Sequence, residues 1–415
     1  SRVYEMAKQW VRDGVEVTVL TCAPNAPSGR LFPGYRNRPW QRETMDGIQV
    51  VRVWSFLAAN KGAILRILNY LSYMLSATLA APFLKRPDIV VATSPQLFCG
   101  WAGVWVHWMR RCPLIVEIRD MWAESITTLT SGKKNRLSRF LEAVEFRLYR
   151  MTPHLVTVGP GYRQVLVQKG MDPANIQIIT NGVDLDFYRP READQSLLRK
   201  WNLEGKFICS YAGTIGMAHK LDVVVQAAKI LQSQHDDRIR FVIAGDGADR
   251  ENLQEAVRSS GLSQVLLIGR QPKEMMPRLY SVSDCCLVHL RQAPLFETVI
   301  PSKLFEVMAM QVPIVLGVRG QAEALVEQAN AGICIEPENA WQLVRALQRL
   351  ADDPAEARRM GEAGRTFVAA NYDRIGLAER YLELIRHIVD ERRDKSTASP
   401  TDQVISSDPP AASRS

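Results

Sequence analysis

Short apolar runs alternate with amphipathic helical stretches along almost the whole chain. In the first half, apolar runs of strand length lie at 16–21, 48–54, 88–94, 114–120, 155–159 and 176–180. In the second half they lie at 207–212, 240–244, 265–268, 285–290, 314–318 and 332–335. Alternation of strands with helices is typical of parallel sheets that are covered by helices on both faces. The pattern therefore predicts the α/β class, with two doubly wound, Rossmann-like sheets.

The alternation is interrupted at residues 181–190. This stretch, NGVDLDFYRP, combines a turn dipeptide with acidic residues and a proline, and no strand or helix period continues through it. Because 415 residues are also more than one hydrophobic core usually serves, we place the boundary between two domains here. The predicted domains are residues 1–185 and 186–391, and a Ser-, Asp- and Pro-rich tail from 392 to 415 is predicted to be disordered.

The first predicted element is a helix. Val3, Met6, Ala7 and Trp10 lie on the apolar stripe of an amphipathic helix that leads to the strand at 16–21. A doubly wound domain normally opens with a central strand, whose loop meets the ligand crevice. We therefore expect a strand and a loop of about ten residues before this helix. We also expect the 415 residues alone to express poorly and to lack activity.

Charge and cysteine content restrict the partner and the compartment. The formal charge is +8, but the Lys and Arg residues are scattered and no nucleic-acid-binding motif accompanies them. An anionic lipid or a phosphorylated substrate therefore fits the excess of positive charge better than nucleic acid does. Seven cysteines without a C-x-x-C pair, and no apolar signal-peptide core, favour a reducing cytoplasm.

Two apolar segments in the first half suggest contact with a membrane. The stretch at 62–84 is interrupted by Arg66 and Asn69, so it falls short of a spanning helix. The segment at 101–109 carries three tryptophans at helical spacing, a residue type that favours the boundary between water and lipid. The two segments are either core helices or a peripheral contact with an anionic membrane surface, at the inner face of the cytoplasmic membrane.

The strand at 207–212 runs into a glycine-bearing loop and then into an apolar-periodic helix. Gly213 and Gly216 let backbone amides approach a phosphate, the helix N-terminus adds a positive dipole, and Lys220 adds a full charge. The alternative is a plain strand-to-helix turn in which the glycines serve only the geometry. The spacing does not match that of a Walker ATPase. We predict a phosphate-binding loop here.

A second glycine loop, AGDGADR at 244–250, begins like a dinucleotide-binding fingerprint. Arg250 stands where the third small residue is needed. The next strand ends at Gly269 and Arg270 and supplies no carboxylate for a ribose. Binding of NAD is therefore disfavoured.

The strongest candidate is the helix at 300–310, IPSKLFEVMAM. Ser302 can cap it, and Lys303 and Glu306, three residues apart, project from one face. Nearly every other side chain is apolar, so the helix is predicted to be buried, and buried Lys and Glu are rare unless something pairs with them. A diphosphate for Lys303 and a ribose diol for Glu306 would meet this demand. A surface ion pair is the alternative.

A fourth candidate is the polar end of the strand at 114–120. Arg119 and Asp120 lie at its carboxyl end, where ligands bind in open α/β sheets. A structural Arg–Asp pair is the alternative interpretation.

Taken together, these motifs resemble glycosyltransferase family 4, whose members have the GT-B fold of two facing Rossmann-like domains. The resemblance extends from Ser1 to about Arg386. It is nearest to bacterial amino-sugar transferases of the L-fucosamine type, which act in O-antigen, capsule and colanic-acid synthesis. Its marks are SRVYEMA at 1–7, NYLS at 69–72, RDMW at 119–122 and NGVD at 181–184.

The resemblance implies a retaining glycosyltransferase that needs no cofactor and no bound metal. It implies transfer of a sugar, with an N-acetylated amino sugar expected, from a UDP-sugar donor to a polyprenyl-diphosphate-linked saccharide. Asp120, Lys303 and Glu306 would be the catalytic residues. The donor site would be made by Gly213, Gly216, Lys220, Ser302, Lys303 and Glu306.

Three positions depart from the family pattern. Many relatives have a glutamate eight positions before the one at Glu306, where this chain has Thr298, with Glu297 one residue earlier. Arg119 stands where many relatives have histidine, and Gln311 replaces a glycine after the helix that carries Glu306. The roles of that first carboxylate and of the histidine are therefore not carried over. The rival interpretations are a non-catalytic binding protein on a degenerate scaffold and an NAD-dependent sugar-nucleotide enzyme.

Overall fold

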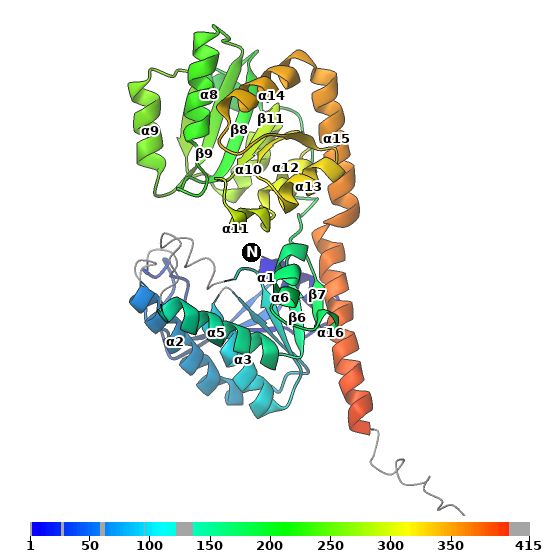
Figure 1. The fold of residues 1–415 in the computed structure, drawn as a ribbon. Coiled ribbons are helices and arrows are strands. Elements are labelled where there is room, and N and C mark those ends of the chain that lie inside the picture. The colour runs from blue at the N-terminus through cyan, green and yellow to red at the C-terminus, as the bar shows by residue number, and fades with distance from the viewer. Residues whose placement is uncertain (1, 26–28, 59–62, 95, 122–135, 398–415) are drawn as a thin grey trace, which may run out of the picture. The chain divides into compact units, whose positions relative to one another are not determined.

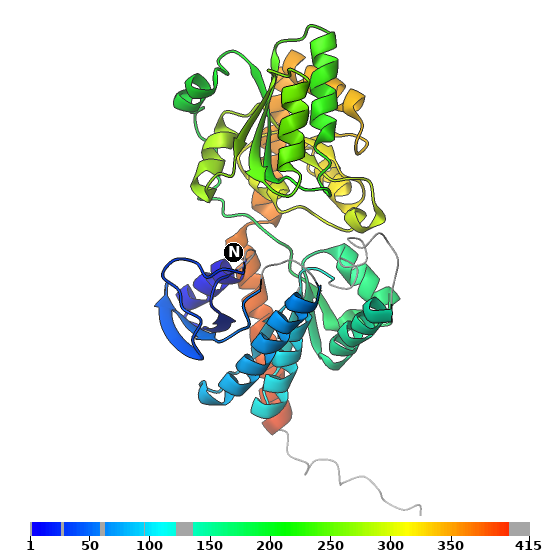
Figure 2. The ribbon, with the colours of Figure 1, turned by 90° about the vertical axis from the view of Figure 1, so that its left-hand side faces the viewer.

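The computed structural model of the chain describes residues 2–25, 29–58, 63–94, 96–121 and 136–397. Contacts divide the chain into two compact units. One unit consists of Ser1–Gln9, Ile118–Leu141 and Val156–Ala378, and the other of Trp10–Glu117, Glu142–Leu155 and Glu379–Ser415. Figures 1 and 2 show the ribbon from two directions. The domain boundary expected between residues 185 and 186 remains a prediction.

Helices and strands alternate through the first half of the chain. Its helices are α1 (Arg2–Arg12), α2 (Ala63–Ala80), η1 (Ala81–Phe83), α3 (Leu97–Arg110), α5 (Arg136–Met151), α6 (Pro160–Gln168) and η2 (Pro173–Asn175). Its strands are β1 (Thr18–Cys22), β2 (Trp40–Met45), β3 (Ile48–Val53), β4 (Val90–Thr93), β5 (Leu114–Ile118), β6 (His154–Thr157) and β7 (Ile176–Ile178).

The second half continues the alternation and ends in helices. Its helices are α7 (Gln195–Trp201), α8 (Asp222–Ser233), α9 (Arg250–Ser259), η3 (Lys273–Met275), α10 (Met276–Ser281), α11 (Pro294–Glu297), α12 (Lys303–Ala309), α13 (Gln321–Gln328), α14 (Ala340–Asp352), α15 (Pro354–Asn371) and α16 (Arg374–Thr397). Its strands are β8 (Phe207–Thr214), β9 (Ile239–Asp246), β10 (Val265–Gly269), β11 (Cys285–His289), β12 (Ile314–Gly317) and β13 (Gly332–Cys334). Every strand predicted from the sequence is present.

The strands of the first half form two sheets rather than the single sheet that the sequence predicted. β3 pairs in parallel with β1 and antiparallel with β2, and β4, β5, β6 and β7 form a second sheet in that order. The sequence pattern missed β2, because its residues, WQRETM, are mostly polar and half of them are exposed. The dipeptide Asp46-Gly47, with φ of 48° and 82°, closes the β2–β3 hairpin and was the available signal.

The second half builds one six-stranded sheet in the order β10-β9-β8-β11-β12-β13, with every neighbouring pair parallel. Successive side chains face opposite sides: Cys209 and Tyr211 pack with α8 and α14, whereas Ile208 and Ala212 pack with α12 and α13. Figure 1 shows helices over both faces of this sheet. The predicted doubly wound parallel sheet is confirmed for this half.

The C-terminal end departs from the prediction in one respect. α16 continues to Thr397, so residues 392–397, where a disordered tail was expected, are helical. The rest of that predicted tail lies outside the described residues. Within the described part of the chain, no helix combines the length and the apolar character needed to cross a bilayer.

Candidate functional site

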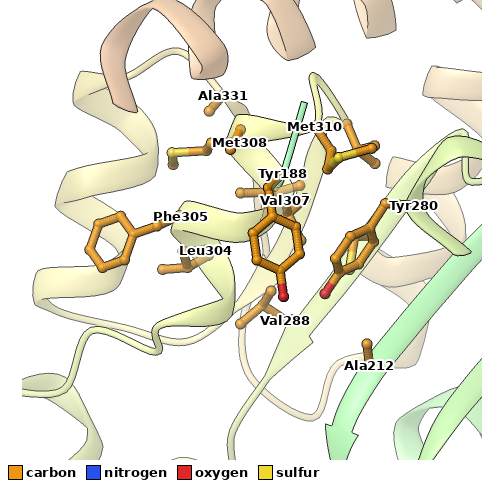
Figure 3. Close-up of a cluster of buried hydrophobic side chains, with 14 of the residues drawn as sticks. Tyr188, Ala212, Tyr280, Val288, Leu304, Phe305, Val307, Met308, Met310 and Ala331 are labelled. Carbon is orange, nitrogen blue, oxygen red and sulfur yellow. The ribbon is translucent and has the colours of Figure 1, made fainter. Parts of the chain in front are cut away.

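α12 carries the two charged residues that the sequence singled out. Its apolar side chains pack into a core cluster of the second half, and Figure 3 shows them beside the rings of Tyr188 and Tyr280. The fully buried side chains of α12 are Leu304, Phe305, Val307, Met308 and Ala309. The predicted burial of this helix is thus confirmed, and Lys303 and Glu306 share the face that the apolar residues leave free.

The ammonium group of Lys303 is buried and has no hydrogen-bond partner among the residues that the structure describes. It lies over the ring of Tyr211, 4.2 Å from the centroid. A Cβ atom at Gly213 would come within 2.6 Å of Nζ. Burial disfavours the charged form and lowers the pKa of Lys303 to about 8. An anionic ligand beside Gly213 would relieve the cost of this buried, unpaired cation.

The carboxyl group of Glu306 lies at the wall of a cavity of about 270 Å³. It accepts a hydrogen bond from the Tyr188 hydroxyl, and the positive charges of Arg374, Lys273 and Lys303 attract it. Desolvation by burial nevertheless raises the pKa of Glu306. The carboxylate is therefore held in one place by its neighbours while it faces an open volume.

The rest of the cavity wall is rich in charge. Arg2, Arg119, Lys273 and Arg374 line it together with Glu5 and Glu306, so four positive charges meet two negative ones. Glu5 bridges Arg374 and Lys273, at 2.8 Å and 3.2 Å. The wall suits a ligand that carries negative charge. A more open hollow of about 690 Å³, beside Trp341, contains none of the predicted site residues.

Gly213, Gly216 and Lys220, for which the phosphate-binding role remains a prediction, differ in conformation and in pairing. Gly213 has a φ of 152°, in a region that glycine alone tolerates. Position 216 does not require glycine, because the atom nearest to a Cβ there would lie 3.7 Å away. Lys220 is half-exposed and pairs with Asp222 at 3.1 Å, and this pair raises its pKa. The charge of Lys220 is thus already balanced, unlike that of Lys303.

Backbone packing explains the second glycine loop. A Cβ at Gly245 would lie 1.9 Å from the carbonyl oxygen of Gly213, and one at Gly247 would lie 2.2 Å from that of Ile215. Gly245 lies opposite Gly213 where β8 and β9 pair, and Gly247 lets the loop after β9 rest on the backbone of the loop after β8. No dinucleotide is needed to account for them.

His289, which the sequence pattern did not single out, holds the loop after β8 in place through a hydrogen bond to its backbone. It is fully buried at the end of β11. Its Nδ1 donates to the carbonyl of His219 at 2.7 Å, and its Nε2 accepts from the backbone N–H of Glu338 at 2.8 Å. Both bonds require a neutral ring with its proton on Nδ1. The only sequence signal is a lone histidine that closes an apolar strand.

The neutral ring of His289 predicts a stability that depends on pH. Burial lowers the pKa of His289, although the Glu338 carboxylate opposes this. Because the folded pKa lies below the unfolded value of about 6.5, the contribution is present above that pH and is lost as the pH falls through the folded pKa. Burial also lowers the pKa of His219, to about 4, with the same sign. Urea unfolding at about pH 7 and about pH 5 should show a smaller loss of stability in His289→Gln than in the wild type. An equal loss in both chains would count against this role for His289.

Ser302 does not cap α12 as predicted. Its φ of −59° and ψ of −24° are already helical, so its hydroxyl makes no capping hydrogen bond, and the side chain is exposed. It does line the cavity that holds Glu306. At the other end of α12, Gln311 takes a φ of 59°, the left-handed conformation that a glycine would adopt there. The helix therefore ends in the usual way despite the substitution.

The position eight residues before Glu306 offers no carboxylate. The hydroxyl of Thr298 donates to the carbonyl of Leu295 at 3.0 Å and so closes α11. The neighbouring Glu297 is exposed.

Arg119 and Asp120 follow β5 directly and are half-buried. Arg119 lines the cavity together with Glu306, so the structure brings the first-half and second-half candidates together at this point. The catalytic role of Asp120 remains a prediction. Trp122, the last residue of the RDMW motif, lies outside the described residues.

Two sequence families match the chain, one after the other. The family described as "Glycosyl transferase 4-like domain" matches residues 1–182, and "Glycosyl transferases group 1" matches residues 194–367. The chain is 24% identical over 407 residues to D-inositol 3-phosphate glycosyltransferase 1 of Catenulispora acidiphila, a match that covers 95% of this chain and 91% of that protein. It is 28% identical over 199 residues to alpha-D-kanosaminyltransferase of Streptomyces kanamyceticus. That match covers 48% of this chain and 50% of the other.

Solved structures share the fold over most of the chain. Sucrose-phosphate synthase from Thermosynechococcus elongatus superposes with a TM-score of 0.72 at 16% identity, covering 94% of this chain and 93% of that one. The Anabaena protein Alr3699/HepE, solved with UDP and glucose, superposes with a TM-score of 0.62 at 15% identity, covering 82% and 86%. The predicted α/β class with two Rossmann-like domains is confirmed.

Proposed function

Because the chain belongs to the group 1, GT4-like glycosyltransferases, retaining enzymes of the GT-B fold that use nucleotide-sugars, we propose that it transfers a sugar from UDP to a polyprenyl-diphosphate-linked saccharide. The sugar is proposed to be an N-acetylated amino sugar, and the place of action the inner face of the cytoplasmic membrane. The observation that carries the proposal is the buried ammonium of Lys303 beside Gly213, with Glu306 on the same face of α12.

Two groups of α12 account for donor binding. The Lys303 ammonium, which finds no acceptor among the described residues, supplies the charge that a diphosphate needs, and the negative charge on that diphosphate grows as the sugar leaves. Glu306 offers an acceptor-only carboxylate for two ribose hydroxyls. UDP as the nucleotide is supported by the structural relative that was solved with UDP and glucose.

The acceptor proposal has independent support. The motifs SRVYEMA, NYLS, RDMW and NGVD resemble those of transferases that act on lipid-linked saccharides. The cavity beside Glu306 presents four positive side chains and two negative ones, which suits an acceptor that carries a diphosphate. Within this proposal Asp120 faces the reacting sugar or its acceptor.

Turnover separates this function from its rival. The position of the first family carboxylate holds Thr298, which favours a non-catalytic binding protein as the second candidate. Incubation with UDP-N-acetylglucosamine, with release of UDP measured, should show turnover of the donor. Binding of UDP without turnover would favour the second candidate. Mass spectrometry of lipid-linked saccharides from cells with and without the protein should then identify the sugar and the acceptor.

We expect chelators to leave the turnover unchanged. Within the described part of the chain, no three His, Cys, Asp or Glu residues cluster as a metal site would require. Lys303 is instead placed to neutralise the diphosphate. Turnover should be measured before and after treatment with EDTA. A loss that Mg²⁺ or Mn²⁺ restores would overturn this expectation.

A further inference from the structure

α2 and η1 expose a row of large apolar side chains. The exposed fractions of Leu75, Leu79 and Phe83 are 59%, 72% and 75%, among the highest of any apolar residue in the described chain. Their spacing of four residues places them along one side of the helix. The opposite side is used for packing, because Ala77 and Ala80 are buried. One face of these helices therefore packs in the core, and the opposite face is exposed.

α3 continues this apolar surface. Trp105 and Trp108 are 52% and 54% exposed and pack edge to face, with their ring centroids 6.1 Å apart. On the other side of the helix, a Cβ at Gly103 would come within 2.7 Å of Ala92 on β4, so α3 lies very close to its sheet. Figures 1 and 2 both show α2 and α3 side by side. Met109, 43% exposed, extends the surface to the end of α3.

Four arginines gather where this surface ends. Arg110 donates to the carbonyl of Leu84, and Arg86 and Arg392 both donate to the carbonyl of Arg111. Arg392 comes from α16, far away in the sequence. No carboxylate of the described residues forms an ion pair with any of these four guanidinium groups. This arginine cluster (Arg86, Arg110, Arg111, Arg392) therefore keeps its positive charge.

We propose that the face formed by α2, η1, α3 and the arginine cluster docks on an anionic lipid bilayer. The tryptophans and the apolar row would enter the headgroup boundary, while the guanidinium groups bind lipid phosphates. A second copy of this chain fits less well, because α2, η1 and α3 of that copy contain no carboxylate that could pair with the arginine cluster. The inference rests on the proposed function only in that docking would bring the enzyme to its lipid-linked acceptor.

Flotation with vesicles tests the docking surface. The wild type should bind vesicles of phosphatidylcholine and phosphatidylglycerol in equal parts, and should bind phosphatidylcholine alone much less. Phe83→Ser and Trp108→Ala should each lower binding about tenfold. Trp341→Ala, a matched control at a tryptophan that is 57% exposed elsewhere, should bind as the wild type does. None of these side chains is buried, so the variants should fold, which circular dichroism can check.

Charge variants test the arginine cluster. Arg86→Gln and Arg111→Gln should each weaken binding to the anionic vesicles about fivefold, with a shallower dependence on salt. Arg358→Gln, at an exposed arginine of α15 away from this face, is the matched control. Equal binding by Arg111→Gln and the wild type would overturn the proposal. So would equal binding of the wild type to neutral and anionic vesicles, or a dimer in solution that Trp108→Ala abolishes.

Activity measurements distinguish a failure of the docking surface from a failure of the proposed function. Release of UDP with an acceptor solubilised in detergent should be unchanged in Trp108→Ala, whereas transfer to an acceptor in vesicles should fall with the binding. Binding that depends on this face, without any transfer, would support the docking surface and refute the proposed acceptor. Transfer in vesicles that these variants leave unchanged would refute the docking surface alone.

Discussion

The Glu306→Ala chain is expected to fold as the wild type does and to lose about 10²–10⁴-fold in kcat/KM for the UDP-sugar. Two charge-assisted hydrogen bonds to the ribose would be lost, each of about 1.5–3 kcal/mol. The fold should survive, because Arg374 and Lys273 keep their ion pairs with Glu5 when the Glu306 carboxylate is removed. Steady-state kinetics with the UDP-sugar varied would measure the loss, and thermal unfolding would check the fold.

Tyr188→Phe is the matched control for Glu306. It removes the hydrogen bond that holds the carboxylate but leaves the carboxylate itself in the cavity wall. We expect this variant to lose less than about tenfold in kcat/KM, because the carboxylate stays in the cavity wall, where solvent can replace the lost hydrogen bond. Wild-type kcat/KM in Glu306→Ala would refute the ribose assignment. An equal loss in both variants would show that Glu306 acts through Tyr188.

Lys303→Met is expected to make the free protein more stable and the enzyme nearly inactive. Methionine keeps the length and the apolar stem of lysine but removes a buried ammonium that has no acceptor in the described part of the chain, a change worth on the order of 1–3 kcal/mol in favour of the fold. The loss of the cation–π contact with the Tyr211 ring offsets part of this gain in stability. The same substitution removes the charge beside Gly213, so kcat should fall about 10²-fold or more.

The pH dependence of the two chains should differ in a defined way. Because the folded pKa of Lys303 is about 8, the affinity of the wild type for UDP should fall as the pH rises above 8, and that of Lys303→Met should not. The unfolded lysine binds its proton up to about pH 10.4, so the wild type should gain stability relative to the variant between these two pH values. Calorimetric titration with UDP and urea unfolding would measure the two effects.

Lys220 provides the control for charge at the same loop. Its ammonium is already paired with Asp222 and is half-exposed, so Lys220→Met should reduce kcat by much less than Lys303→Met does. An unchanged kcat in Lys303→Met, or an equal loss in both lysine variants, would contradict the assignment of the diphosphate to Lys303.

Local patterns in the sequence determined the class of fold and the burial of the key helix. Strand length, apolar runs and turn residues located the strands of both halves, because these signals depend on neighbours along the chain. The apolar residues around Lys303 and Glu306 likewise showed that α12 is buried and that its two charges need partners. A polar strand such as β2 has no such pattern, and only its pairing with β3 reveals it.

Only the tertiary structure decided which groups meet. The sequence assigned both Lys220 and Lys303 to the donor phosphates, whereas the fold pairs Lys220 with Asp222 and leaves the ammonium of Lys303 buried against Gly213. In the same way, only the fold brings His289 to the carbonyl of His219 and Arg392 to the end of α3. Periodicity shows which face of a helix or strand is buried, but it does not show which residues cover that face. The partner is set by the order of strands in the sheet and the path of α16, which bring together residues that are far apart in the chain.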